Sequence, residues 1–188
     1  MTTWQIDGAH TSVEFAVKHL MIATVRGRFG KVSGTVTTTG EAPGHAAVAV
    51  AIDVASIDTR EGQRDAHLRS ADFFDAEKFP TITFLSKRTA GDVDGSFRLI
   101  GDLTIRGTTR EVELEVTSEG RTKDPWGNKR AGYSARTTIH RKDFGLTWNQ
   151  LLEAGGVAVG DEVRISLDLE LVLQVDAPVA SQVATAAA

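Results

Sequence analysis

The chain has 188 residues, a formal net charge of −4 at pH 7 and no cysteine. Hydrophobic residues make up 41% and charged residues 24%, which are ordinary values for a soluble globular domain. This composition excludes disulfides, cysteine-ligated zinc and thiol nucleophiles, and the negative net charge gives no sign of the electrostatic footprint that a nucleic-acid partner needs.

The N-terminal residues show no basic segment followed by an apolar run, so we expect no secretory signal and a cytoplasmic location. No apolar run approaches the length of a membrane-spanning helix, so we expect no stable membrane insertion. Residues 1–175 are predicted to form one domain. Residues 176–188 lack periodicity and follow the last clear strand, which predicts a disordered tail.

Most of the chain alternates apolar and polar residues with the period of half-buried β-strands. In residues 11–20, for example, Val13, Phe15 and Val17 share one face with His19. The other strands are expected over residues 28–39, 45–54, 81–87, 97–105, 112–116, 133–140 and 163–173. About eight antiparallel strands with mostly short links predict an all-β protein, a barrel or a sandwich.

Residues 45–54 are apolar on both faces, so neither face is expected simply to meet water. One face carries three alanines, including Ala49 and Ala51, and such a row of small side chains favours a cavity wall. A strand packed beneath a helix or a loop explains the pattern equally well, because protein interiors normally fill their space. The valine face, over residues 48–54, would then lie outside, and its need for cover predicts a homodimer.

Residues 119–132 are polar, with Pro125 and Gly127 at a turn, and predict a long hairpin loop. Trp126 lies at the tip of this loop. Two positions for its side chain remain open: an exposed contact, or an indole that folds back onto the protein.

Residues 64–84 interrupt the alternation. Residues 65–71 predict about two helical turns, and Asp72 is predicted to cap a following turn. Phe73 and Phe74 need an apolar partner, and the open end of a barrel is the natural one. The segment is therefore predicted to cap one end of the sheet structure.

Several sequence blocks occur in a specific order: HTSVEFAVKH at 10–19, SIDT at 56–59, RDAHLRSADFFD at 64–75, FPTITF at 79–84 and GDLTIRGTT at 101–109. Together they resemble the YceI-like family over about residues 3–173. The resemblance implies a lipocalin-like antiparallel β-barrel of about eight strands, with a short helical insert capping one end and an elongated apolar lumen. It also implies a long-chain amphiphilic ligand, such as a polyisoprenoid, a polyprenyl diphosphate, an isoprenoid quinone or a fatty-acid derivative. The protein would then act as a carrier or reservoir for this ligand.

The residues expected to contact this ligand share an apolar or rim position on the predicted strands and insert. They are Phe15, Val17, His19, Phe29, Ala49, Ala51, Phe73, Phe74, Phe84, Leu103 and Phe144. Arg26 and Arg28 are candidates for binding a polar headgroup at the mouth. Solvated charges at a strand edge, which only prevent aggregation, would give the same sequence pattern.

Two alternatives stay open. An eight-stranded barrel with a filled interior would be a structural or interaction module rather than a binding protein. An enzyme acting on an isoprenoid-type lipid would need a convergent acid and base in the lumen, and His19 with Asp102 or Asp143 is the set to look for. The chain has no nucleophile elbow, phosphate loop or histidine pair at metal-ligand spacing, so we predict no catalysis, no metal site and no cofactor.

Overall fold

The computed structural model describes residues 1–38, 46–153 and 155–174, so the tail predicted at 176–188 lies outside the described residues. The strands are β1 (Thr2–Ile6), β2 (Ser12–His19), β3 (Ala23–Phe29), β4 (Val32–Thr38), β5 (Ala47–Asp53), β6 (Ile57–Asp58), β7 (Thr81–Gly91), β8 (Ser96–Ile105), β9 (Thr108–Lys123), β10 (Lys129–His140) and β11 (Val159–Gln174). The helical segments are α1 (Gly62–Arg69) and the 3₁₀ turns η2 (Val54–Ser56) and η3 (Arg141–Phe144).

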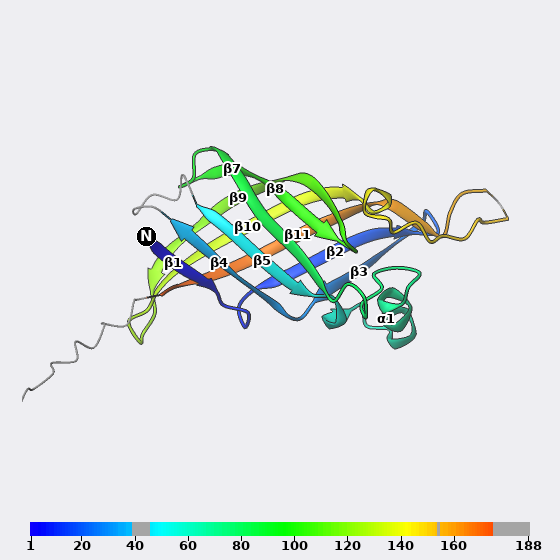
Figure 1. Ribbon diagram of the computed structural model, residues 1–188, viewed down its shortest axis with the longest axis horizontal. Helices are drawn as coiled ribbons and strands as arrows, with labels where there is room; N and C mark the ends of the chain where they lie inside the picture. The colour runs from blue at the N-terminus through cyan, green and yellow to red at the C-terminus, as the bar shows by residue number, and fades with distance from the viewer. Residues whose placement is uncertain (39–45, 154, 175–188) are drawn as a thin grey trace, which may run out of the picture.

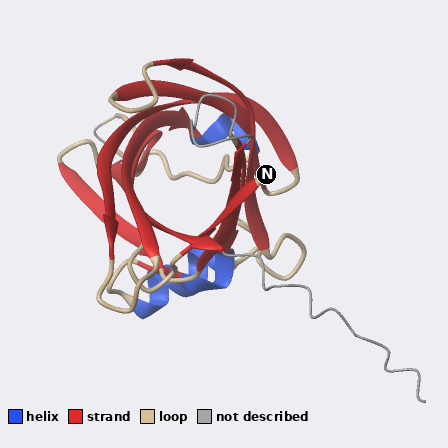
Figure 2. Ribbon diagram, turned by 90° about the vertical axis from the view of Figure 1, so that its left-hand side faces the viewer, coloured by secondary structure: helices blue, strands red, loops and turns tan. Residues whose placement is uncertain are grey.

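The sheet closes on itself because β1 pairs with both β4 and β11 (Figure 2). Three strands of the barrel consist of two segments each. In the first, β1 and β2 lie end to end along β11. In the second, β3 pairs with β2 and β4 pairs with β1. In the third, β6 pairs with β3 and β5 pairs with β4. Counted in this way, the barrel has eight strands, each antiparallel to the one before it, as predicted. A closed sheet leaves no unpaired edge.

The alternation in β11 separates the inside of the barrel from the outside. Ile165, Leu167 and Leu169 face the lumen, whereas the residues between them face outward. Ala135 of β10 pairs with Leu167 and lies on the same inner face. The half-buried strand expected over residues 163–173 is present, and its apolar face lies toward the lumen.

Two glycines allow aromatic rings to lie flat against the inner wall. A Cβ atom on Gly27 would come within 2.3 Å of Cζ of Phe15, and one on Gly101 within 2.6 Å of Cζ of Phe84. Both distances are shorter than real carbon–carbon contacts. The absence of a side chain at these positions thus sets where the rings of Phe15 and Phe84 lie within the barrel.

The prediction of a long loop at residues 119–132 is wrong. β9 continues to Lys123 and β10 begins at Lys129, so a turn at residues 124–128 joins them. The Asp124 carboxylate accepts hydrogen bonds from the backbone N–H groups of Trp126 and Asn128, which fixes this turn. Residues 119–123 of β9 are exposed and polar, and of residues 129–132 on β10 only Ala131 is fully buried, so polar residues hide the strand period here.

The insert lies at one end of the barrel, opposite the N-terminus (Figure 1). Helix α1 forms as predicted, but Glu61 caps it, and Asp72 bonds to Nε2 of His67 at 2.9 Å instead of capping a turn. Arg64 donates to the carbonyl oxygen of Thr59 at 2.7 Å, and Arg69 donates to that of Ile57 at 3.0 Å. These two arginines attach the insert to the barrel through backbone acceptors.

Candidate functional site

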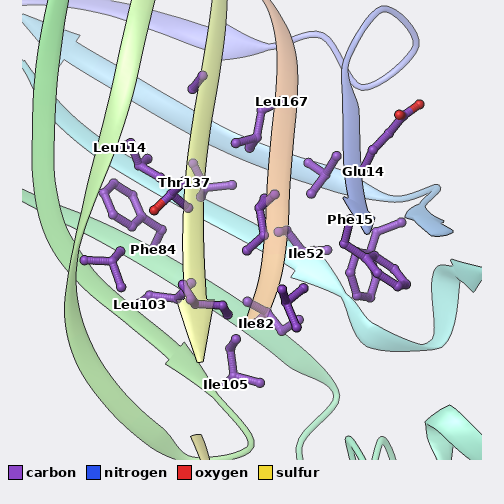
Figure 3. A pocket seen from close by; sticks show the side chains of 18 of the residues that line it. Glu14, Phe15, Ile52, Ile82, Phe84, Leu103, Ile105, Leu114, Thr137 and Leu167 are labelled. Atoms are coloured by element: carbon purple, nitrogen blue, oxygen red, sulfur yellow. The ribbon is translucent and has the colours of Figure 1, made fainter. Parts of the chain in front are cut away.

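A cavity of about 240 Å³ lies inside the barrel. Figure 3 shows part of its wall, with Phe84, Leu114 and Leu167 from three different strands around the same space. Almost all of the lining side chains are apolar. Those with polar atoms are Glu14, Thr89, Tyr133, Thr137 and Arg141. The exposed carboxylate of Glu14 points away from the other lining side chains in Figure 3.

The buried charge in this wall is satisfied by backbone carbonyls. The guanidinium of Arg141 donates to the carbonyl oxygens of Leu146 at 2.5 Å, Trp148 at 2.9 Å and Gly160 at 2.9 Å, with a longer contact to that of Val159 at 3.4 Å. Burial lowers the pKa of Arg141, although Asp161 opposes the effect. The cation therefore holds the chain after η3 in place and offers little to a molecule in the lumen.

Aromatic side chains cover the cavity at the α1 end. The ring of Phe73 is buried and lies 5.2 Å from that of Trp148, measured between centroids. The imidazole of His67 packs edge-on against Trp148 at 4.7 Å. Phe74 meets Phe29 of the barrel wall at 6.0 Å, again edge to face. The insert is thus held to the barrel by ring contacts.

Seven of the predicted ligand-contact residues line the cavity: Phe15, Val17, Phe29, Phe73, Phe74, Phe84 and Leu103. The others lie elsewhere. His19 is exposed at the end of β2, and Phe144 is almost fully buried in the core next to the cavity instead of lining it. The sequence pattern identified these two residues as apolar or rim positions but could not place them relative to the hollow.

The prediction that Ala49 and Ala51 form the wall is wrong. Val48, Val50 and Ile52 line the cavity, and Ala51 borders a hollow on the outer surface together with Asp53. Asp53 was the signal in the sequence, because it shares the alanine face and a carboxylate marks the side that meets water. The valine face lies inside the barrel, so it gives no support to the predicted homodimer.

Arg26 and Arg28 lie on the outer face of β3, and neither lines the cavity. Arg28 donates to the Asp58 carboxylate at 3.2 Å, and both side chains are exposed to solvent. The prediction that these arginines bind a headgroup is therefore wrong for this arrangement, and the alternative of solvated edge charges fits it.

The three residues considered for catalysis do not converge. His19 is exposed at the barrel rim, and Asp143 is exposed in η3. Asp102 forms an ion pair with Lys87, with 2.6 Å between carboxylate oxygen and Nζ, and none of the three lines the cavity. The acid–base set predicted for an enzyme is not assembled in the lumen.

A second, more polar hollow of about 420 Å³ lies at the opposite end of the barrel from α1. It shares Val36, Tyr133 and Leu171 with the lining of the lumen, so the two spaces adjoin. Its polar lining comprises Thr2, Thr38, Arg121, Thr122, Lys129 and Arg130. Sequence reasoning missed this hollow, since five of its twelve lining residues come from the segment predicted to be a loop and the others from strands distant in sequence.

Arg130 links several chain segments beside this hollow. It donates to Asp124 at 2.8 Å and to Asp7 at 2.9 Å, and it also binds Glu170. The hydrogen bond from His10, followed in size by the one from Arg130, lowers the pKa of Asp7 to about 2. The hydrogen bond between His10 and Asp7 also raises the pKa of His10. These contacts join β10 to the β1–β11 seam, where the barrel closes.

The ligand-type atoms of Asp7, His10 and Glu170 lie within 4.8 Å of one another. Arg130 already neutralises both carboxylates in this cluster. We therefore interpret the group as a structural ion-pair network. No helix within the described residues is long and apolar enough to cross a bilayer.

The chain matches known proteins over nearly its whole length. Residues 4–171 match the family described as the YceI-like domain. UPF0312 proteins of Staphylococcus aureus strains are 36% identical over 173 residues, which is 90% of this chain and 97% of theirs. A UPF0312 protein of Vibrio cholerae is 38% identical over 139 residues, 74% of each chain.

Solved structures share the barrel. The YceI protein of Campylobacter jejuni superposes with a TM-score of 0.71 at 28% identity, covering 84% of this chain and 90% of that one. A domain from Saccharophagus degradans described as polyisoprenoid-binding superposes with a TM-score of 0.71 at 15% identity, over 91% of this chain and 98% of that one. The second likeness concerns the fold alone.

Proposed function

The chain belongs to the YceI-like family, and from this premise we propose that it binds a long-chain amphiphilic lipid in the barrel lumen, as a carrier or reservoir. The proposed ligands are of the isoprenoid type: a polyisoprenoid, a polyprenyl diphosphate or an isoprenoid quinone. The observation that carries the proposal is the apolar cavity of about 240 Å³, whose buried cation is satisfied by backbone carbonyls.

The size of the cavity suits a hydrocarbon chain. An engineered apolar cavity of about 150 Å³ in another protein stays dry and binds benzene, which has six carbon atoms. On that scale, 240 Å³ accommodates about ten carbon atoms, or about two isoprene units. A longer chain would extend into the adjoining polar hollow. A filled-core module would leave no such space.

The energetics favour recognition of a class of lipids over a single compound. At about 0.3 kcal/mol per heavy atom, two isoprene units contribute roughly 3 kcal/mol. One charged hydrogen bond to a headgroup contributes about 1.5–3 kcal/mol. The tail therefore matches or exceeds a single headgroup contact, so several amphiphiles of suitable length should bind.

The comparisons and the site support binding over catalysis. The polyisoprenoid-binding domain of Saccharophagus degradans has the same fold, so this kind of barrel can house such a ligand. Within the described residues, the acid–base set predicted for an enzyme lies outside the cavity. We propose a non-enzymatic role on these grounds.

Native mass spectrometry of the purified protein, followed by organic extraction, tests the proposal. We expect a bound lipid that the extraction releases, and we expect empty protein to take up prenyl probes with affinity that rises with chain length. A protein that is isolated empty and takes up no prenyl probe would rule the proposal out.

Two further parts of the sequence-based prediction remain proposals. Cell fractionation tests the cytoplasmic location. Light scattering over a range of protein concentrations tests the homodimer, which would now need a face other than the valine face of β5.

A further inference from the structure

The tip of the β9–β10 hairpin concentrates positive charge in a chain whose net charge is −4. We call residues 121–130 the basic hairpin: they contain Arg121, Lys123, Lys129 and Arg130, against one acidic residue, Asp124. Lys123 and Lys129 are exposed, and their side chains have no hydrogen-bond or ion-pair partner within the described residues. These two cations are therefore available to a partner.

Asp124 does not oppose these charges toward solvent, because it is used inside the turn. Its carboxylate accepts hydrogen bonds from the backbone N–H groups of Trp126 at 3.0 Å and Asn128 at 2.8 Å. It also accepts from the side chains of Asn128 at 2.9 Å and Arg130 at 2.8 Å. The turn is thus preorganised, and it presents the indole of Trp126 with 82% of its surface exposed.

The basic hairpin stands beside the polar hollow that adjoins the lumen, at the end of the barrel opposite α1 (Figure 1). Arg121, Lys129 and Arg130 belong both to the hairpin and to the lining of this hollow. Whatever the hairpin touches therefore comes close to this hollow, whose lining also includes Trp4 and Tyr133.

We propose that the basic hairpin docks reversibly on an anionic lipid bilayer and brings the polar end of the barrel to the membrane. Docking itself follows from the hairpin alone, whereas its use in lipid exchange rests on the proposed function. An exposed tryptophan prefers the membrane–water interface, where its ring is apolar and its N–H stays hydrated. Lysines beside it are attracted to anionic headgroups over about a Debye length.

A bilayer fits this surface better than a protein partner does. A specific protein interface buries more than about 1,000 Å² with complementary shape, and a single narrow turn offers little of either. A lipid surface adapts to a protruding turn and needs only an interfacial ring and positive charge.

The other exposed apolar cluster lies at the α1 end and serves as a matched control. Leu20, Met21 and Ile22 form the β2–β3 turn, and Leu151 lies on the neighbouring loop, whose Ala158 accepts from the N–H of Leu20 at 2.8 Å. Ile22 is 82% exposed, the same fraction as Trp126. Its end of the barrel is covered by Phe73 and Trp148, so docking there would not reach the polar hollow.

Vesicle co-sedimentation tests the proposal with phosphatidylcholine vesicles made with and without phosphatidylglycerol. We expect the wild type to bind only the anionic vesicles, and added salt to weaken the binding. Lys123→Gln should weaken binding about fivefold and Trp126→Ser about tenfold, together about fiftyfold. Neither residue lines the lumen or the polar hollow.

The control is Lys18→Gln combined with Ile22→Ser, which makes the same change in charge and a comparable change in apolar exposure at the α1 end. It should bind anionic vesicles as the wild type does. No binding by the wild type, equal binding to neutral vesicles, or an equal loss in the control variant would overturn the docking proposal.

Uptake of a prenyl probe from detergent solution separates docking from lipid binding. The Lys123→Gln, Trp126→Ser variant should take up the probe as well as the wild type does, with an unchanged melting temperature. If the wild type takes up no probe, the proposed function fails, and the vesicle result still decides the docking proposal.

Discussion

The two ends of the barrel are closed by different chemistry. At the α1 end, the rings of Phe73 and Trp148 pack together, and Arg141 is buried among backbone carbonyls. At the other end, Arg130 binds three carboxylates beside a polar hollow. Rings pack over the lumen at the α1 end, whereas the ion-pair network at the other end lies beside a small buried apolar cluster of Ile6, Ala131 and Leu171. The two ends of the barrel therefore differ: aromatic rings cover the α1 end, and a polar hollow adjoins the lumen at the other.

Removing the buried cation at the α1 end should have the largest effect. Arg141→Met leaves the carbonyl oxygens of Leu146, Trp148 and Gly160 without this donor, so we expect a loss of about 3–5 kcal/mol in the free energy of unfolding. Urea denaturation measures it. A loss below about 1 kcal/mol would show that the chain after η3 is held by other contacts.

Truncating the ring at the same end should come next. Phe73→Ala removes a buried ring that packs on Trp148 and lines the cavity, with an expected loss of about 3 kcal/mol and faster release of bound lipid. Phe73→Leu is the control, because it keeps most of the apolar volume and should retain lipid longer. Equal release rates for both variants and the wild type would mean that the insert does not close the lumen.

At the polar end, Arg130→Met should lower the stability by less than Arg141→Met does, since Asp7, Asp124 and Glu170 are left close together without their cation but remain partly screened by solvent. Thermal and urea unfolding measure the loss. High salt should reduce the difference from the wild type, in contrast to the Arg141→Met variant, whose acceptors are uncharged carbonyls. A salt-independent difference would argue against the electrostatic account of this end.

The smallest effect concerns Asp7 and depends on pH. The folded-state pKa of Asp7 is about 2, below the ordinary 3.8. Its contribution to the free energy of unfolding is therefore present above about pH 4 and is lost as the pH falls toward 2. We expect the wild type to lose on the order of 1 kcal/mol more than Asp7→Asn over that range, after solvent screening. His10 has a raised pKa, so its contribution is present below pH 6.5 and is lost as the pH rises through its folded-state value. Parallel stability curves for the two proteins below pH 4 would contradict this assignment.

The sequence predicted the parts of the molecule that local patterns control. The alternation over residues 163–173 predicted a half-buried strand, and Phe73 and Phe74 predicted an insert that covers the barrel end. The resemblance supplied the closed barrel. On β5 both faces are apolar, so alternation could not choose between them, and the prediction for Ala49 and Ala51 failed.

Long-range contacts explain what the sequence could not show. Arg130 lies 123 residues from Asp7 and 40 from Glu170, so nothing local marks it as the centre of an ion-pair network. Arg141 is followed by the charged residues Lys142 and Asp143, and its burial depends on carbonyls that the fold brings together. The ends of β9 and β10 over residues 119–123 and 129–132 are mostly polar, so they left no period to detect.

The central claim is that the lumen holds vacant apolar volume that a hydrocarbon chain occupies. Ala135 lines this volume on β10, whereas Ala51 lies outside the barrel on β5, so the same alanine-to-phenylalanine change tests both positions. We predict that Ala135→Phe folds and loses most of its prenyl-probe uptake, and that Ala51→Phe folds and keeps it. Equal uptake by the two folded variants would contradict the account, because the probe would then bind outside the lumen.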